Sequence, residues 1–187
     1  MFGIDILREE HENIRIFTKY VRKICGQMME GMEIEKETLL HCVDFMKNYA
    51  DIHHHGKEEE ILFKVMVENL GPVANKMVNM GMMIEHNIGR YHVDSLDKVV
   101  NTLEGKATTQ QKLDIATHAL AYADLLLRHL EKENTVLYPF AARNLSSELI
   151  EKVNEESKVY EEEGRKKGIS RYVEWLKSVY KEVEKAE

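Results

Sequence analysis

The stretch with the strongest consequences for the fold is residues 53–63, HHHGKEEEILF, because it pairs histidine with glutamate twice at a spacing of four. The pairs are His54 with Glu58 and His55 with Glu59. Residues four apart on an α-helix lie on one face, one turn above the other. Each pair can therefore present an imidazole and a carboxylate to a metal ion. Alone, the stretch is more typical of a charged, solvent-exposed helix face.

A second copy of the pattern lies at residues 129–139, HLEKENTVLYP. When the two copies are aligned, His54 recurs as His129. In the same alignment Glu58 recurs as Glu133, whereas the second histidine–glutamate pair does not recur. The repeat favours the first pair as metal ligands, and two imidazoles with two carboxylates are a typical start for a di-iron or di-manganese site in a helix bundle. The other aligned positions are Lys57 with Lys132, Leu62 with Leu137, Phe63 with Tyr138, His55 with Leu130 and Glu59 with Asn134.

Composition indicates an all-α protein. The 187 residues include only two prolines, 32% of them are charged, and good helix formers such as Leu, Met, Glu and Lys are abundant. This length is typical of one domain with a sizeable core. The net charge of −7, without a basic block, argues against nucleic acid or an anionic membrane as the partner. No apolar run approaches the length of a membrane span.

The N-terminus and the cysteines predict a cytoplasmic protein. Residues 1–5, MFGID, lack the basic segment followed by an apolar segment that marks a secretory signal. The two cysteines, Cys25 and Cys42, form no Cys-x-x-Cys motif. We therefore expect two free thiols in a reducing compartment.

Helical periodicity predicts an antiparallel, up-down-up-down four-helix bundle with two additional C-terminal helices. We assign residues 1–143 to a metal-binding bundle, and residues 144–187 to a helical extension that packs on the bundle or is used in dimerisation. Pro139 is expected to kink or end the fourth long helix. The helices are expected at residues 4–29, 33–68, 73–103, from 108 to about Pro139, 147–163 and from 170 onward.

Each of the four long helices carries a histidine on its apolar stripe. On the second helix the stripe contains His54 and Glu58. The residues that follow them, His55 and Glu59, are rotated by about 100° from that stripe around the axis of an α-helix. We expect the latter two to face outward or to support the site from behind its ligands. The third-helix methionines Met77, Met80, Met82 and Met83 are expected to pack the core. The fourth-helix stripe is Ile115, Ala119, Tyr122, Leu126, His129, Glu133, Val136 and Phe140.

Spacing puts the four stripe histidines in one layer. His11, His54, His86 and His129 follow one another at intervals of 43, 32 and 43 residues. In an up-down bundle, two residues are level when they are equally far along the chain from the turn that connects their helices. For each consecutive pair of these histidines, the two distances differ by about one helical turn or less. Without a metal, the layer would bury four imidazoles and two carboxylates at a high cost. Donors of this kind without thiolate suit iron, manganese or zinc, but a closed, mononuclear structural zinc site fits them poorly.

These motifs together resemble the hemerythrin-like (HHE cation-binding) proteins, and the resemblance covers most of the chain. It includes residues 7–11 (LREEH), residues 54–63, Glu85-His86 followed by Gly89-Arg90, and residues 129–139. The resemblance implies a four-helix bundle that holds two iron ions with an oxo or hydroxo bridge. The residues it implies as terminal ligands are His11, His54, His86 and His129, and those it implies as bridging carboxylates are Glu58 and Glu133.

The chain departs from the oxygen-carrying members of this family. Met82 stands where they have a second third-helix histidine, and His129-x-x-x-Glu133 stands where they have His-x-x-x-x-Asp. The set of four histidines and two glutamates is closer to that of the iron–sulfur cluster repair proteins, whose short cysteine-bearing N-terminal domain this sequence lacks. Lys64 follows Phe63 where the family often has proline, which concerns packing alone.

Three functional hypotheses follow. The first is a cytosolic di-iron protein that binds, senses or reduces a small oxidant such as dioxygen, peroxide or nitric oxide, with an electron-donor protein where turnover occurs. The second is iron handling, iron sensing or iron–sulfur cluster repair without redox turnover. The third is a metal-free structural or dimerisation module that uses the two C-terminal helices. Whether the protein is an enzyme stays open at this point.

Overall fold

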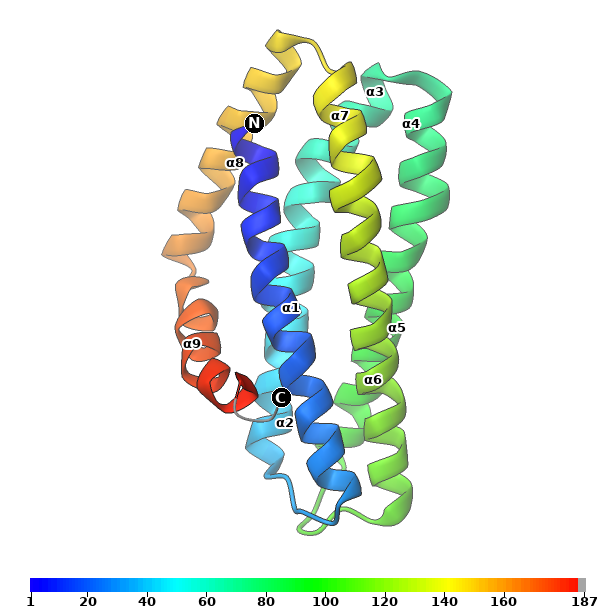
Figure 1. Ribbon diagram of the computed structural model, residues 1–187, viewed down its shortest axis with the longest axis vertical. Helices are drawn as coiled ribbons and strands as arrows, with labels where there is room; N and C mark the ends of the chain where they lie inside the picture. The colour runs from blue at the N-terminus through cyan, green and yellow to red at the C-terminus, as the bar shows by residue number, and fades with distance from the viewer. Residues whose placement is uncertain (185–187) are drawn as a thin grey trace.

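The computed structural model describes residues 1–184, and within that range it contains helices and no strand. Four helical rods run antiparallel to one another and form a bundle, as Figure 1 shows. The expected all-α, up-down-up-down bundle with additional C-terminal helices is therefore confirmed. The first rod is α1 (Phe2–Met29).

Each of the other three rods is a chain of helical segments that follow one another without a break. π-helical segments, labelled η, interrupt the α-helix in all three. The second rod consists of α2 (Lys36–Asp44), η1 (Phe45–His55), η2 (Glu58–Phe63) and α3 (Lys64–Asn69). The third consists of α4 (Gly71–Met77), η3 (Val78–Met82) and α5 (Met83–Asn101), and the fourth of α6 (Thr109–Lys132), η4 (Glu133–Leu137) and α7 (Tyr138–Asn144).

The turns between the rods lie close to the gaps between the helices expected from sequence. Gly71 separates the second and third rods with φ of 70°, a left-handed conformation that glycine adopts without strain. Thr108 begins the fourth rod with a capping box, in which its hydroxyl accepts from the Gln111 amide and the Gln111 side chain accepts from the Thr108 amide.

Of the two effects expected of Pro139, a kink or an end of the fourth helix, the rod does not show the second. Pro139 lies in the first turn of α7, directly after the π-helical segment η4, and the rod continues to Asn144. Proline is tolerated here because the π-helical segment directly before it already interrupts the α-helical hydrogen-bond pattern.

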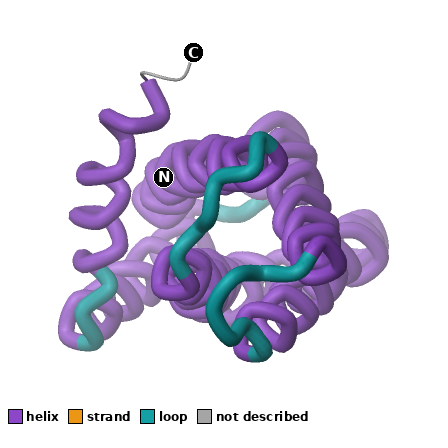
Figure 2. Tube along the Cα trace, turned by 90° about the horizontal axis from the view of Figure 1, so that it is seen from below, coloured by secondary structure: helices purple, strands orange, loops and turns teal. Residues whose placement is uncertain are grey.

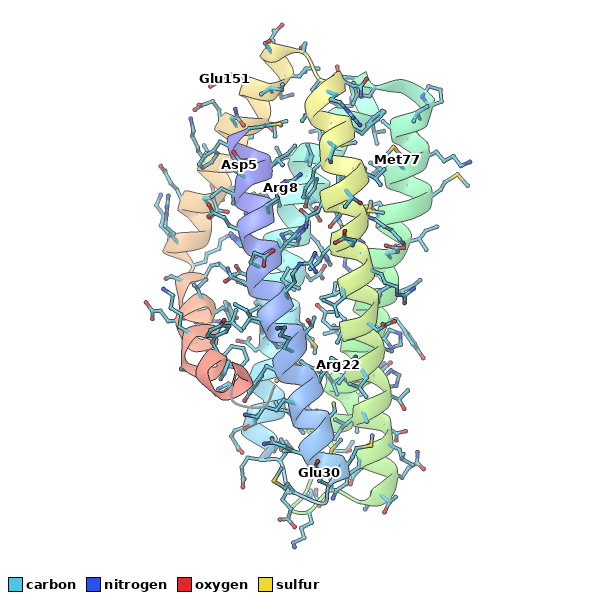
Figure 3. The ribbon with its side chains drawn as sticks, in the orientation of Figure 1. Asp5, Arg8, Arg22, Glu30, Met77 and Glu151 are labelled. Carbon is cyan, nitrogen blue, oxygen red and sulfur yellow. The ribbon has the colours of Figure 1, made fainter. Side chains whose placement is uncertain are left out.

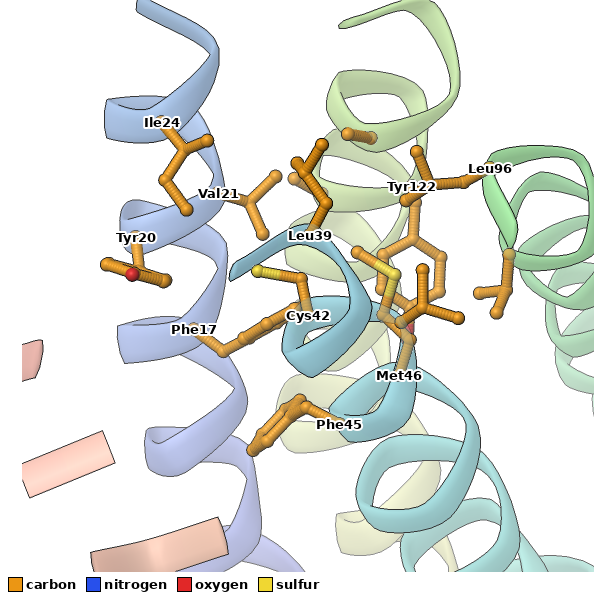
Figure 4. Close-up of a cluster of buried hydrophobic side chains, with 14 of the residues drawn as sticks. Phe17, Tyr20, Val21, Ile24, Leu39, Cys42, Phe45, Met46, Leu96 and Tyr122 are labelled. Atoms are coloured by element: carbon orange, nitrogen blue, oxygen red, sulfur yellow. The ribbon is translucent and has the colours of Figure 1, made fainter. Parts of the chain in front are cut away.

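Two apolar clusters fill the bundle on either side of its middle. The larger cluster includes Phe17, Phe45 and Tyr122, and Figure 4 shows these rings packed between α1, the second rod and α6. The smaller cluster includes Leu62 and Leu137 and lies toward the Gly71 end. Both clusters exclude water, so any polar side chain between them is buried in an apolar surrounding.

The two C-terminal helices lie along the outside of the bundle, beside α1. Helix α8 (Ser147–Lys166) contacts α1 and η2, and helix α9 (Ser170–Glu184) contacts α1. Figures 1 and 2 show both helices outside the ring of four rods. Trp175 of α9 packs against Tyr20 and Phe45, with ring centroids 5.6 and 5.9 Å apart.

Two sets of side chains lie differently from the sequence-based expectation. Met80 is 68% exposed, because it falls on the outer face of the third rod, whereas Met82 packs in the core. Val136 of the predicted fourth-helix stripe is 53% exposed, and its neighbour Leu137 is buried instead. The π-helical segments shift the register by which an α-helical stripe was assigned.

Among the helices within the described residues, none is both long and apolar enough to cross a membrane.

Candidate metal centre

A polar layer lies between the two apolar clusters. Its level falls between Arg8 and Arg22 of α1, where Figure 3 shows nitrogen and oxygen atoms inside the bundle. Two pairs of histidines from neighbouring rods meet there through their Nε2 atoms. His11 and His54 approach to 3.1 Å, and His86 and His129 to 3.0 Å. The four predicted histidines therefore come together, and all four are buried.

The two predicted carboxylates lie between these histidine pairs. Oε2 of Glu58 is 3.8 Å from His54 Nε2 and 3.5 Å from His86 Nε2. The oxygens of Glu133 are 3.3 Å from His11 Nε2 and 3.1 Å from His129 Nε2. Each carboxylate thus touches one histidine of each pair. This is the arrangement that a carboxylate shared between two ions requires.

His55 also enters the layer, which corrects the expectation that it faces outward or stands behind the ligands. It is 2% exposed, and its ring stacks on His86 with the centroids 3.7 Å apart. The reason is the π-helical segment η1, which ends at His55. A π turn holds more residues than an α turn, so neighbouring side chains diverge less and His54 and His55 both point inward.

The donors form two groups that share Glu58. One group joins His11 and His54 with both carboxylates, and the other joins Glu58 with three histidines. Within each group the candidate ligand atoms lie within 4.8 Å of one another. The layer can therefore hold two adjacent metal ions. The second group consists of His55, Glu58, His86 and His129.

Unpaired buried atoms show that this layer fits a metal. Oε2 of Glu58, both oxygens of Glu133 and Nε2 of His55 have no hydrogen-bond partner among the described residues. Buried polar atoms without partners are costly, and a cation would satisfy all four. Two donors at about 2.0–2.1 Å from one ion and at right angles to each other are about 3 Å apart. The Nε2 pairs have this spacing.

A carboxylate stands behind four of the five rings and holds each of them at Nδ1. Nδ1 of His54 is 2.9 Å from Glu10, and Nδ1 of His129 is 2.9 Å from Glu85. Because Nδ1 is engaged, Nε2 is the atom that faces the layer, as in metal-binding histidines generally. The remaining pairs are His86 with Glu59 at 2.6 Å and His55 with Asp51 at 3.2 Å.

Cations hold these carboxylates in turn. Lys57 donates to Glu10 at 2.5 Å, and Lys132 pairs with Glu85. Arg90 binds both carboxylates of the remaining pairs, with its Nε 2.9 Å from Asp51 and its terminal nitrogen 2.8 Å from Glu59. Except for Glu59, these supporting groups were not predicted from the sequence. A signal existed, because Glu10-His11 recurs as Glu85-His86.

The two halves of the bundle repeat one another at an interval of 75 residues. The interval is the same at every position of the layer, so each half contributes one glutamate–histidine pair and one His-x-x-Lys-Glu motif. The repeat therefore explains why the donors arrange themselves about an approximate twofold axis. The pairs are Glu10/Glu85, His11/His86, His54/His129, Lys57/Lys132 and Glu58/Glu133.

Two departures from the repeat make the layer asymmetric. His55 has Leu130 as its counterpart, so one side of the layer has three imidazoles and the other has two. Tyr138 has Phe63 as its counterpart. The Tyr138 hydroxyl donates to Glu58 Oε1 at 2.5 Å and lies 3.1 Å from His11 Nε2, so it faces the side with two imidazoles.

Electrostatics around the layer favour a bound cation. Burial and the neighbouring charge of Glu133 raise the pKa of Glu58 well above its usual value. Burial lowers the pKa of His54 to about 3. Burial would also lower the pKa of His129, but the carboxylates of Glu133 and Glu85 raise it to about 9. The metal-free layer therefore retains a proton where a cation would otherwise balance its carboxylates.

A small cavity of about 40 Å³ reaches the ring of His55 between η1 and α5. Arg90 and Tyr122 line it, and Gly89 opens it where its counterpart in the repeat, Ile14, has a side chain. This volume suits a molecule of a few atoms. His92 and His118, which were left out of the prediction, lie elsewhere and pair through their Nδ1 atoms at 3.1 Å.

Comparison with protein families gives one match for this chain. The sequence model described as "Hemerythrin HHE cation binding domain" matches residues 3–141, which include all four rods up to α7. Comparisons with curated proteins and with solved structures give no match.

Proposed function

This chain belongs to the hemerythrin HHE cation-binding family, and from that membership we propose that its bundle holds two iron ions and binds a small oxidant. Dioxygen, peroxide and nitric oxide are the candidate ligands. The observation that carries the proposal is the pair of buried donor groups that share Glu58. The donors are imidazoles and carboxylates without thiolate, a set that suits non-haem iron.

The proposed ligands divide between the two ions. His11 and His54 would hold one ion, and three histidines would hold the other. Glu58 and Glu133, each of which lies near one histidine of each pair, would be shared between the ions. The assignment adds one residue to the set predicted from sequence, because the third histidine of the second ion, beside His86 and His129, is His55. Iron in such a site supplies open coordination positions and one-electron redox chemistry.

The ligand-binding position follows from the asymmetry of the donors. The side with His11 and His54 has two imidazoles and the other side has three. With both carboxylates shared between the ions, the side with two imidazoles would keep more open positions for an exogenous ligand. The Tyr138 hydroxyl is a neutral hydrogen-bond donor next to that side. It would stabilise a bound ligand that carries negative charge. Arg90, through Asp51 and Glu59, fixes the rings on the opposite side.

Turnover of an oxidant would consume electrons, so the proposal includes an electron-donor protein. It also includes a cytoplasmic location, where a reducing environment keeps thiols free. Cys25 and Cys42 are both buried, and neither forms a disulfide. Reversible ligand binding without a donor would make the protein a carrier or a sensor, and steady consumption of peroxide would make it an enzyme.

Iron handling without turnover is the second candidate function. The observation that favours it is that the donors come from all four rods, so metal binding and folding of the bundle are linked. In that case the thermal stability of the protein would follow its iron occupancy. This property would suit a protein that senses iron or donates it to iron–sulfur cluster repair.

One experiment separates the two candidates. The iron-loaded, reduced protein is mixed anaerobically with each oxidant in turn, and its absorption spectrum is followed over time. Oxidant binding predicts a saturable spectral change, and a donor-dependent enzyme predicts repeated cycles when a chemical reductant is supplied. Iron handling predicts no ligand-dependent change, together with a large loss of melting temperature on chelation.

A further inference from the structure

Helix α8 lies outside residues 3–141, which the family model covers, and yet one of its side chains reaches the surroundings of the metal centre. Glu161 of α8 forms an ion pair with Lys57 and lies 3.3 Å from Nε2 of His53. Lys57 is 1% exposed, so this ion pair is inside the molecule. An ion pair shielded from water is screened little by salt.

The contacts continue from Lys57 to a predicted metal ligand. Lys57 donates to Oε1 of Glu10 at 2.5 Å, and Oε2 of the same carboxylate is 2.9 Å from Nδ1 of His54. His53 also contacts Glu10, at 3.0 Å. A buried ammonium group needs more than one carboxylate to offset its loss of hydration. Glu10 and Glu161 together meet that need.

The close approach of α8 depends on two glycines. A Cβ atom at Gly164 of α8 would lie 2.6 Å from the His53 ring, and a Cβ atom at Gly56 of the second rod would collide with the Tyr160 hydroxyl. That hydroxyl donates to the Ile52 carbonyl at 2.9 Å. Glycine on each side of the contact therefore lets α8 come near enough for Glu161 to reach Lys57.

The other half of the repeat shows what the centre looks like without such a helix. Lys132 occupies the position equivalent to Lys57 and pairs with Glu85, which holds His129. Lys132 is 49% exposed at its side chain, and within the described residues no second carboxylate lies at ion-pair distance from it. The additional carboxylate is thus a feature of the His54 half alone.

We propose that α8 is part of the metal centre and that Glu161 is a positioning residue for His54. Glu161 fixes Lys57, Lys57 fixes Glu10, and Glu10 directs Nε2 of His54 toward the ion on the His11/His54 side. This inference rests on the proposed function, because it concerns the ion bound there. It predicts that the C-terminal extension adjusts the affinity of one of the two metal positions and leaves the other unchanged.

The test is Glu161→Gln, with Glu162→Gln as the matched control. Both substitutions remove one negative charge from neighbouring positions of α8, but Glu162 is exposed. Binding of Co²⁺ to the metal-free protein is measured by calorimetry and by the visible spectrum. Glu161→Gln should weaken one of two binding steps about tenfold or more, the range found for groups behind metal-binding histidines. The other step, and both steps of the control, should keep wild-type affinity.

A second variant and a metal-free readout complete the test. Gly164→Ala displaces α8 without changing charge and should weaken the same step. In the metal-free protein, nitrogen NMR should show His54 in a single tautomer, and Glu161→Gln should give a mixture. Unchanged affinity and an unchanged tautomer in Glu161→Gln, or equal weakening of both steps, would overturn the inference. If wild-type protein binds no Co²⁺, the proposed function itself fails, and the inference fails with it.

Discussion

The two sides of the metal centre come from the same repeated pattern, but they differ in what the chain adds to each. The side with His11 and His54 has two imidazoles and the Tyr138 hydroxyl. The opposite side gains His55 as a third imidazole and has Phe63 where the repeat has tyrosine. Two departures from an internal repeat are therefore enough to turn a nearly symmetric layer into one side with two imidazoles and one side with three.

The groups that support the histidines also differ between the two sides. Lys57 and its carboxylate partners are covered by α8, whereas Lys132 is half exposed. In the proposed centre, the side with two imidazoles thus has the more buried support. This combination is expected where a site must accept a ligand and still hold its rings in place, since the ligands cannot rely on a full coordination shell for their orientation.

The largest expected effect comes from removing the group that both sides share. Glu58→Ala should abolish binding of two metal ions, because Glu58 belongs to both donor groups. Elemental analysis after iron loading and desalting would measure this, and Glu133→Ala should behave in the same way. Glu60→Ala, at an exposed position of the same rod, is the control and should retain two ions. Two ions bound to Glu58→Ala would contradict a bridging role.

The next substitution makes the two sides alike. His55→Leu introduces the residue that the repeat has at Leu130 and removes the third imidazole of its side. The iron content should fall from two ions to one per chain, because that ion loses a donor while His11 and His54 are untouched. Retention of two ions at wild-type affinity would restore the sequence-based expectation that His55 is not a ligand.

The pH dependence of the metal-free protein should show opposite contributions from two predicted ligands, His54 and His129, one on each side. Burial lowers the pKa of His54 to about 3 in the folded protein. Below about pH 6.5 the unfolded protein therefore binds a proton at His54 that the folded protein does not bind. The free energy of unfolding should then fall with acidification by up to about 1.4 kcal/mol per pH unit. Despite burial, Glu133 and Glu85 raise the pKa of His129 to about 9, so its stabilising contribution is complete below about pH 6.5. That contribution should be lost as the pH rises toward 9.

Urea unfolding of the metal-free protein between pH 5 and 9 would measure both the loss of stability toward acid pH and the loss of stability toward alkaline pH. A maximum near pH 6.5 is expected. His54→Gln should make the fall of stability toward acid pH less steep, while the contributions of His86 and His55, whose pKa values burial also lowers, remain. A profile without a maximum, or an acid slope unchanged in His54→Gln, would contradict the electrostatic difference between His54 and His129.

The smallest effect concerns the ligand. Tyr138→Phe introduces the residue that the repeat has at Phe63. Iron content should stay at two ions, while the affinity for azide, a small anionic probe, should fall about tenfold with the loss of one charge-assisted hydrogen bond of about 1.5 kcal/mol. A spectral titration measures this. Unchanged azide affinity would show that the ligand binds away from the Tyr138 side.

Much of this architecture could be predicted from sequence because helical periodicity is a local property. Helical periodicity located the four rods, and spacing located the level at which His11 and His86 meet their partners. The prediction was wrong at His55 and Val136 for one physical reason. Both side chains were assigned to a face of the helix with the rotation per residue of an α-helix. They lie in π-helical segments, where that rotation is smaller, and the side-chain pattern does not reveal where such segments occur.

The support behind the ligands was only partly predictable. Glu10 and Glu85 each precede a predicted ligand, and their recurrence at the repeat interval of 75 residues was a usable signal. Glu161 gave no such signal, because it depends on how α8 docks on the second rod. That docking is determined by the close contacts of Gly56 and Gly164, which become visible only in three dimensions.

The most direct test of the central claim is the metal content of the wild-type protein. It should be purified without oxygen from iron-rich medium and analysed for metals, and its absorption spectrum should then be recorded during exposure to air. The account predicts about two iron ions per chain, as the two donor groups require, and near-ultraviolet bands of a bridged di-iron centre that grow in on exposure. One zinc ion per chain, or no metal, would contradict it.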